Sequence, residues 1–108
     1  MKPLLLTATL LLPSLAHADS YYLGAGRWTC EALLTANETQ DMPKVYQAVG
    51  WLLGYWSAET NYRGDVFTDI VEQAGGQAII VQTLAECRKF PKDTKLYELA
   101  NSMIGNTG

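Results

Sequence analysis

The chain has 108 residues, with eight basic and eleven acidic side chains, one histidine and two cysteines. A chain of this length holds one domain with a modest hydrophobic core. Its acidic balance argues against a nucleic-acid partner, which needs a basic face.

Residues 1–18 have the pattern of a secretory signal peptide. Lys2 supplies the basic start, a leucine-rich stretch follows, and Ala16-His17-Ala18 matches an A-x-A cleavage site. The apolar stretch is shorter than the roughly 20 residues that span a bilayer, so a cleaved leader is favoured over a membrane anchor. We therefore expect cleavage before Asp19, a mature domain of residues 19–108 in the periplasm, and no stable membrane insertion.

Cleavage would change the charge balance. It would remove Lys2 and the only histidine, His17, and would leave seven basic and eleven acidic side chains, a net charge of −4. Carboxylates have reference pKa values near 4, so the net charge of the seven basic and eleven acidic side chains would rise to about +7 in strong acid. Without histidine, an imidazole switch near pH 6 is excluded. Any response to acid would depend on Asp and Glu.

The first segments of the mature chain are an arm and a short helix. Residues 19–27 carry two glycines and no hydrophobic periodicity, and we expect a mobile arm there. A short helix is expected at residues 28–34, because Thr29 can cap it and Glu31 in the first turn suits the helix dipole. A polar linker follows at residues 37–41.

The strongest helical pattern covers residues 44–61, where Asp41 can cap and Pro43 suits the first turn. The apolar residues reach nearly all round this helix, and they are Val45, Tyr46, Val49, Trp51, Leu52, Leu53, Tyr55 and Trp56. Such a pattern is typical of a helix that is buried on several sides or shared with a second subunit. Gly50 and Gly54 would let another backbone approach closely. Two interpretations stay open, a central core helix or a binding and dimer surface.

The second half of the chain predicts two more helices. Residues 62–65 form a turn, residues 66–71 fit either a helix or an extended segment, and Gly75-Gly76 interrupts the pattern. A helix is expected at about residues 77–89 and ends before Pro91. A last helix is expected at about residues 94–103. The residues expected to face inward are Ile80, Leu84 and Cys87, then Leu96, Leu99, Ala100 and Met103.

Cys30 and Cys87 are the only cysteines, which allows one intramolecular disulfide, with intermolecular bridging as the alternative. The loop between them spans 57 positions. Closing such a loop contributes about 4 kcal/mol in the chain-entropy model, a large share of a total stability of about 5–15 kcal/mol. We expect an all-α fold, a small single-domain bundle of about four helices closed by this disulfide.

The mature chain offers few groups for catalysis. It lacks a histidine for a triad, and its distant cysteines form no C-x-x-C redox or haem motif. Zinc-ligand spacings and phosphate-binding glycine motifs are also missing from the sequence. Paired carboxylates such as Asp65 with Asp69 remain, but so small a chain leaves little room for a deep cleft. We expect no enzyme, no cofactor and no metal.

Four carboxylates gather between the end of the central helix and the segment after it, and they are Glu59, Asp65, Asp69 and Glu72. One interpretation is a solvated acidic rim. The other is a set of protonation sites that control whether the apolar surface is covered.

Several segments occur in an order that points to one family. Residues 28–34 read WTCEALL, residues 78–82 read AIIVQ, and residues 87–91 read CRKFP. With the leader and the aromatic central helix, they make the chain similar to the HdeA/HdeB family of periplasmic acid-stress chaperones. The first segment resembles the family's W-T-C-E-x-(F/L)-L opening, and the resemblance covers roughly residues 28–104.

The resemblance implies a small helical fold with one disulfide and a homodimer that hides its apolar surface at neutral pH. In acid, the dimer would loosen and the exposed surface would keep unfolded periplasmic proteins in solution. Carried over by position, the dimer and client surface would comprise Val49, Trp51, Leu52, Leu53, Tyr55 and Trp56.

We therefore expect an ATP-independent holdase that dissociates or opens below about pH 4. The alternative is a periplasmic inhibitor or immunity protein that binds one enzyme or toxin. Leu53-Gly54-Tyr55 is loosely similar to the L-G-Y pattern of type VI immunity proteins. Suppression of aggregation in acid would favour the holdase, and one tight partner at neutral pH would favour the inhibitor.

Overall fold

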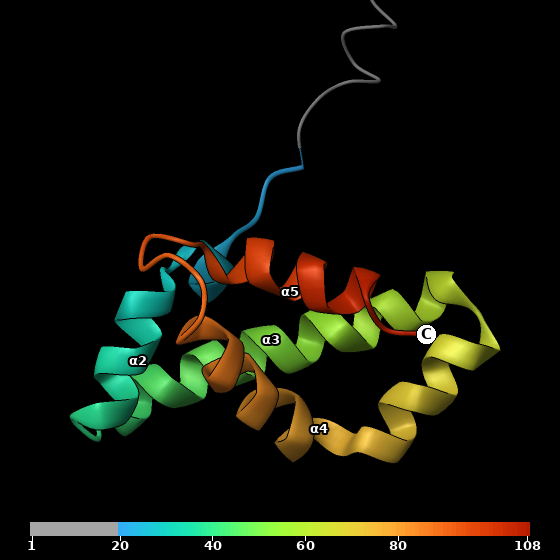
Figure 1. The fold of residues 1–108 in the computed structure, drawn as a ribbon, viewed down its shortest axis with the longest axis horizontal. Coiled ribbons are helices and arrows are strands. Elements are labelled where there is room, and N and C mark those ends of the chain that lie inside the picture. Colours follow the sequence, from blue (N-terminus) through green and yellow to red (C-terminus); the bar gives the residue numbers. More distant parts are fainter. Residues whose placement is uncertain (1–19) are drawn as a thin grey trace, which may run out of the picture.

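A computed structural model describes residues 20–108, which form a bundle of helices (Figure 1). The elements are a short 3-10 helix, η2 (Gly24–Arg27), and the α-helices α2 (Cys30–Glu38), α3 (Met42–Arg63), α4 (Asp65–Cys87) and α5 (Leu96–Gly105). The predicted all-α bundle of about four helices with one disulfide is confirmed. The predicted signal peptide and its cleavage site lie outside the described residues.

The helix α3 runs along the middle of the bundle, with α5 along one side and α4 along another (Figure 1). The chain reverses between α3 and α4 at Gly64, whose φ of 86° lies in the region that side chains rarely adopt. None of the helices within residues 20–108 combines the length and the apolar character needed to cross a membrane.

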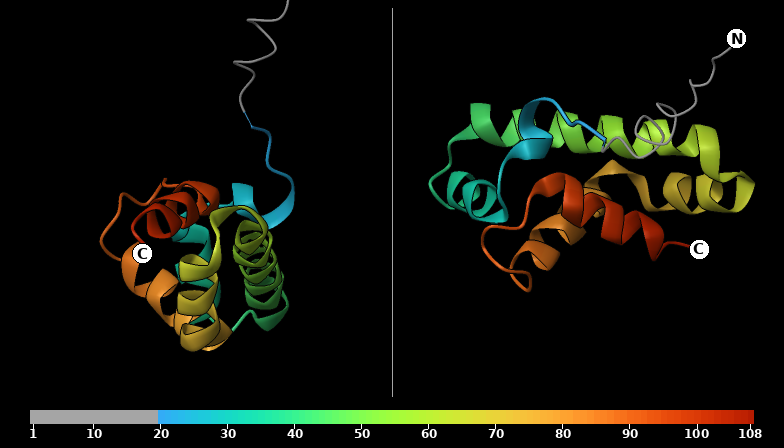
Figure 2. Two further views of the ribbon diagram at one scale, coloured as in Figure 1. Left: turned by 90° about the vertical axis from the view of Figure 1, so that its right-hand side faces the viewer. Right: turned by 90° about the horizontal axis from the view of Figure 1, so that it is seen from above.

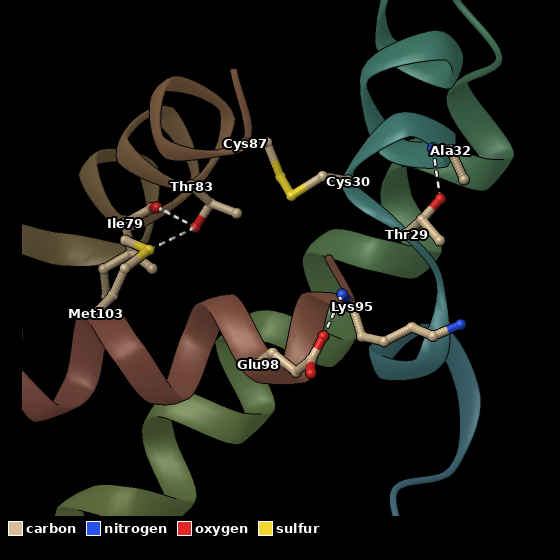
Figure 3. Close-up of a disulfide and its surroundings, with 9 residues drawn as sticks. All are labelled: Thr29, Cys30, Ala32, Ile79, Thr83, Cys87, Lys95, Glu98 and Met103. Carbon is tan, nitrogen blue, oxygen red and sulfur yellow. Dashed lines mark hydrogen bonds between the residues drawn. A yellow bond between two sulfur atoms is a disulfide. The ribbon is translucent and has the colours of Figure 1, made fainter. Parts of the chain in front are cut away.

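The start of α2 agrees with the sequence. The Thr29 side chain caps the helix, because its Oγ1 accepts a hydrogen bond of 3.1 Å from the backbone N–H of Ala32 (Figure 3). Asp41 also occupies the N-cap position of α3, but its side chain makes no capping hydrogen bond. The expected cap of α2 is therefore confirmed, and that of α3 is confirmed in position only.

The second half of the chain agrees with the prediction at its glycine pair. Residues 66–71 are helical, which settles the open alternative for that segment, and Gly75 has non-helical angles (φ 79°, ψ 164°) inside α4. The predicted interruption is therefore present, because the kink at Gly75 separates two helical segments of α4. The last helix begins at Leu96, two residues later than expected.

The core consists of two apolar clusters. The first surrounds the disulfide and contains Ala25, Cys30, Leu33, Ala48, Leu52, Cys87, Leu96, Leu99 and Ala100. The second lies farther from the disulfide, between α3, α4 and α5, and contains Trp56, Phe67, Ile79 and Ile104. Tyr55 and Met103 pack against both clusters, which joins them into one continuous interior.

The predicted disulfide is present between Cys30 at the start of α2 and Cys87 at the end of α4 (Figure 3). The two Cα atoms lie 5.2 Å apart, within the usual range for a disulfide. Beside it, Thr83 is buried, and its hydroxyl donates a 2.8 Å hydrogen bond to the carbonyl of Ile79. The inward face of α4 thus includes Ile79 and Thr83 besides the predicted Cys87. The predicted Ile80 and Leu84 are half-buried and pack against the first cluster.

Candidate functional site

The candidate site is the aromatic face of α3, where the sequence placed the dimer and client surface. Leu52 and Trp56 are 1% and 5% exposed and belong to the core. The other four residues are half-buried, and they are Val49, Trp51, Leu53 and Tyr55. The described chain therefore covers much of this face, and its role in binding stays a prediction.

Residues 20–28, which we call the arm, cover Trp51. The indole N–H of Trp51 donates a 2.7 Å hydrogen bond to the carbonyl of Leu23. A Cβ atom at Gly26 would lie only 2.1 Å from Trp51 Cζ2, so the ring packs directly on the glycine backbone. Figure 2 shows η2, within the arm, lying beside α3 and near the start of α5. The expectation of a mobile arm is wrong, because aromatic contacts with distant helices hold this segment.

The arm contributes one aromatic ring to a cluster that ties it to two helices. Tyr22 stacks on Tyr97 of α5, with centroids 4.1 Å apart, and meets Trp51 and Tyr55 of α3 edge-on at 6.3 and 5.9 Å. Trp51 and Tyr55 stack on each other at 5.0 Å. We call these four rings and Asn101 the latch, because together they connect the arm, α3 and α5.

Hydrogen bonds complete the latch. Asn101 donates from Nδ2 to the hydroxyl of Tyr22 at 3.2 Å, and its Oδ1 accepts from the hydroxyl of Tyr55. Burial raises the pKa of Tyr55 above its ordinary value, whereas the hydrogen bond from Asn101 lowers the pKa of Tyr22. Since tyrosine titrates near pH 10, these hydroxyls do not sense acid. An acid response must come from carboxylates.

The four predicted pH-sensing residues lie around the hairpin formed by α3 and α4. Glu59 pairs with Arg63 one turn later, with 2.7 Å between Oε1 and Nε. Asp65, Asp69 and Glu72 are exposed on the first half of α4. They form a solvated rim, with Glu59 as the only one of the four in an ion pair among the described residues. Their role as sensors stays a prediction.

Two other carboxylates make contacts that the sequence reasoning missed. Glu98 accepts a 2.8 Å hydrogen bond from the backbone N–H of Lys95 and so caps α5 (Figure 3). Glu86 accepts hydrogen bonds from Gln82 at 3.0 Å and Lys89 at 3.4 Å. Charged acceptors form stronger hydrogen bonds than neutral ones, so protonation weakens both contacts. A glutamate three residues after the N-cap, here Lys95, is the signal that could have revealed Glu98.

The described residues contain no group of three or more side chains placed to hold a metal ion. Comparisons of the chain with protein-family models, with curated proteins and with solved structures find no match. The likeness to the HdeA/HdeB chaperones thus rests on the segments quoted above.

Proposed function

We propose that the protein is a periplasmic, ATP-independent acid-stress chaperone that exposes the aromatic face of α3 at low pH and holds unfolding proteins in solution. One observation carries this proposal. The segments that cover this face at the latch, the arm and α5, both lie outside the loop that the disulfide closes.

The covalent loop runs from Cys30 to Cys87 and contains α2, α3 and α4. The arm precedes it and α5 follows it, so the covalent loop holds neither segment. Tyr22, Tyr97 and Asn101 therefore can leave Trp51 and Tyr55 without any covalent change. The disulfide would meanwhile keep α2 and α4 packed against α3 and limit the opening.

Acid would loosen these two covers. Protonation of Glu98 weakens the cap of α5, the helix that supplies Leu96, Leu99 and Ile104 to the core. The positive charge that remains in acid adds repulsion within the chain, and net charge far from zero destabilises a compact state.

A homodimer at neutral pH forms part of the proposal. Tyr46 is 65% exposed, and a Cβ atom added at Gly50 or Gly54 would meet no other atom within 4 Å. This strip of α3 is thus uncovered within the protomer, and glycines allow a second helix to approach closely. We propose that two α3 helices pair along it.

The experiment uses the mature protein, residues 19–108, between pH 7 and pH 2. We expect size-exclusion chromatography to report a dimer at pH 7 and a monomer below about pH 4. Binding of the dye bis-ANS and suppression of alcohol dehydrogenase aggregation should increase over the same range. An equal mass of lysozyme serves as the control for nonspecific protection.

The failure of both dye binding and client protection in acid would overturn the proposal. A single tight partner captured at neutral pH, without protection of clients in acid, would favour the inhibitor alternative.

A further inference from the structure

Met103, near the end of α5, occupies a junction in the core that the proposed acid response does not use. Its side chain packs against both apolar clusters, the one around the disulfide and the one that contains Trp56. Within residues 20–108, Tyr55 is the only other half-buried apolar residue that contacts both clusters. Met103 therefore helps to hold the end of α5 against α3 and α4.

The same side chain meets solvent. Met103 is half-buried and lines a surface cleft of about 430 Å³ between α4 and the end of α5. A molecule as small as hydrogen peroxide can enter a cleft of this size. Met103 thus combines a packing role in the core with access from outside.

A thioether is open to oxidation by hydroperoxides. The sulfur attacks one oxygen of hydrogen peroxide, an S–O bond forms, the O–O bond breaks and water leaves. The sulfur is oxidised to a sulfoxide and the peroxide is reduced to water. Both cysteines are held in the disulfide, so within residues 20–108 no free thiol competes for the oxidant.

The surroundings of the sulfur suit a thioether better than a sulfoxide. The buried hydroxyl of Thr83 lies 3.9 Å from the Met103 sulfur and donates its single proton to the carbonyl of Ile79 at 2.8 Å (Figure 3). A sulfoxide oxygen is a polar acceptor, and this hydroxyl has no second proton to give it. Burial of a polar oxygen without a hydrogen bond is unfavourable, so oxidation should weaken the packing at the junction.

We infer that Met103 is an oxidation site, and that its conversion to a sulfoxide by hydroperoxides releases the end of α5 at neutral pH. The release uncovers the apolar side chains of Trp56 and Ile79, which belong to the second cluster. Methionine sulfoxide reductases restore the thioether, so the change is reversible. The inference does not depend on the proposed function, because it requires neither acid nor a client.

The mature chain contains one other methionine, Met42, which supplies a matched control. Met42 is half-buried at the start of α3 and packs against neither cluster. In the Met42→Leu variant only Met103 can form a sulfoxide, and in the Met103→Leu variant only Met42 can. Leucine has nearly the volume of methionine, so both variants should fold, and circular dichroism checks this.

The experiment treats both mature variants with hydrogen peroxide at pH 7 and compares each with its own untreated form. Peptide mass spectrometry should show one added oxygen on the remaining methionine of each variant. In urea, the equilibrium constant for folding should fall about tenfold after oxidation of Met103 and stay unchanged after oxidation of Met42. Bis-ANS should bind more strongly to the oxidised Met42→Leu variant than to the other three samples.

Hydrogen exchange separates a local release from a general loss of stability. After oxidation of Met103, exchange of backbone amides should become faster in α5 than in α2, which the disulfide holds.

Three results would overturn the inference. One is a Met103 that stays reduced under conditions that oxidise Met42. Another is unchanged stability and dye binding after Met103 has gained its oxygen. The third is an equal increase of exchange in α5 and α2, which would exclude a local release of α5.

Discussion

Gly26→Ala is the sharpest test of the docked arm. The added Cβ would lie 2.1, 2.4 and 2.5 Å from three atoms of the Trp51 ring, whereas ordinary contacts begin near 3.4 Å. The ring is stacked on Tyr55 and hydrogen-bonded to Leu23, so it cannot move aside without losing these contacts. We expect the arm to detach from α3 instead.

The size of the effect follows from these contacts. Overpacking in a close-packed site costs about 1–3 kcal/mol. Loss of the hydrogen bond between the Trp51 indole and Leu23 adds about 0.5–1.5 kcal/mol. The free energy of unfolding should therefore fall by about 1.5–4.5 kcal/mol.

Urea unfolding followed by circular dichroism measures this change, and Gly105→Ala is the matched control. Gly105 is exposed at the end of α5, and a Cβ there meets nothing within 4 Å. That variant should gain about 0.4–1 kcal/mol through the unfolded chain. Gly26→Ala should also bind bis-ANS at pH 7. If Gly26→Ala were as stable as Gly105→Ala, the docking of the arm on Trp51 would be refuted.

Four further variants test the disulfide, the latch, the cap of α5 and the dimer. Cys30→Ser should lower the free energy of unfolding by about 4 kcal/mol, because it opens a loop of 57 positions, and should abolish client protection in acid. Urea unfolding and the aggregation assay check both results, and full protection by the variant would show that the disulfide is dispensable. Tyr55→Phe should be less stable than the wild type below pH 10, and the difference should narrow above it. Burial raises the pKa of Tyr55 in the folded protein, so the hydroxyl stabilises the fold fully below its unfolded pKa near 10, and this stabilisation is lost as the pH rises further. Unfolding measurements at alkaline pH test this, and a stability difference between the wild type and Tyr55→Phe that stays constant would contradict the reasoning. Glu98→Gln removes the charged acceptor from the cap of α5 and should be less stable by up to about 1 kcal/mol at pH 7. Urea unfolding at pH 7 tests it, and a variant as stable as the wild type would exclude a role for the charge. Gly54→Leu should give a folded monomer at pH 7 by size-exclusion chromatography, and an unchanged dimer would move the interface elsewhere.

Local patterns in the sequence predicted most of the helices. Thr29 and Pro43 mark helix starts through their own side chains, and the apolar residues mark the helix that follows Pro43. The bend at Gly75 was predicted only as an interruption, because a glycine pair is equally compatible with a loop, a helix end or a bend. Which one forms depends on packing between helices.

The cover over α3 could not be predicted in this way. The ring of Tyr22 meets Tyr97, which lies in another helix far along the sequence, and no local pattern links them. The sequence reasoning grouped Leu52 and Trp56 with the surface residues because apolar side chains extend nearly all round the helix. The structure separates them, since these two point into the bundle and Trp51 points toward the arm.

The arm lies outside the disulfide loop but is joined to it at Cys30, and this has a consequence for how a client would be released. A tethered segment meets its binding surface at an effective concentration in the millimolar range, because its attachment keeps it nearby. When the pH returned to neutral, the arm would compete with any bound client for Trp51 and Tyr55. The arm would displace any client that binds these two side chains more weakly than the arm itself does. This release would require no nucleotide. The five residues between Gly24 and Cys30 would thus keep the arm close enough to return to α3 as soon as the carboxylates regain their charge.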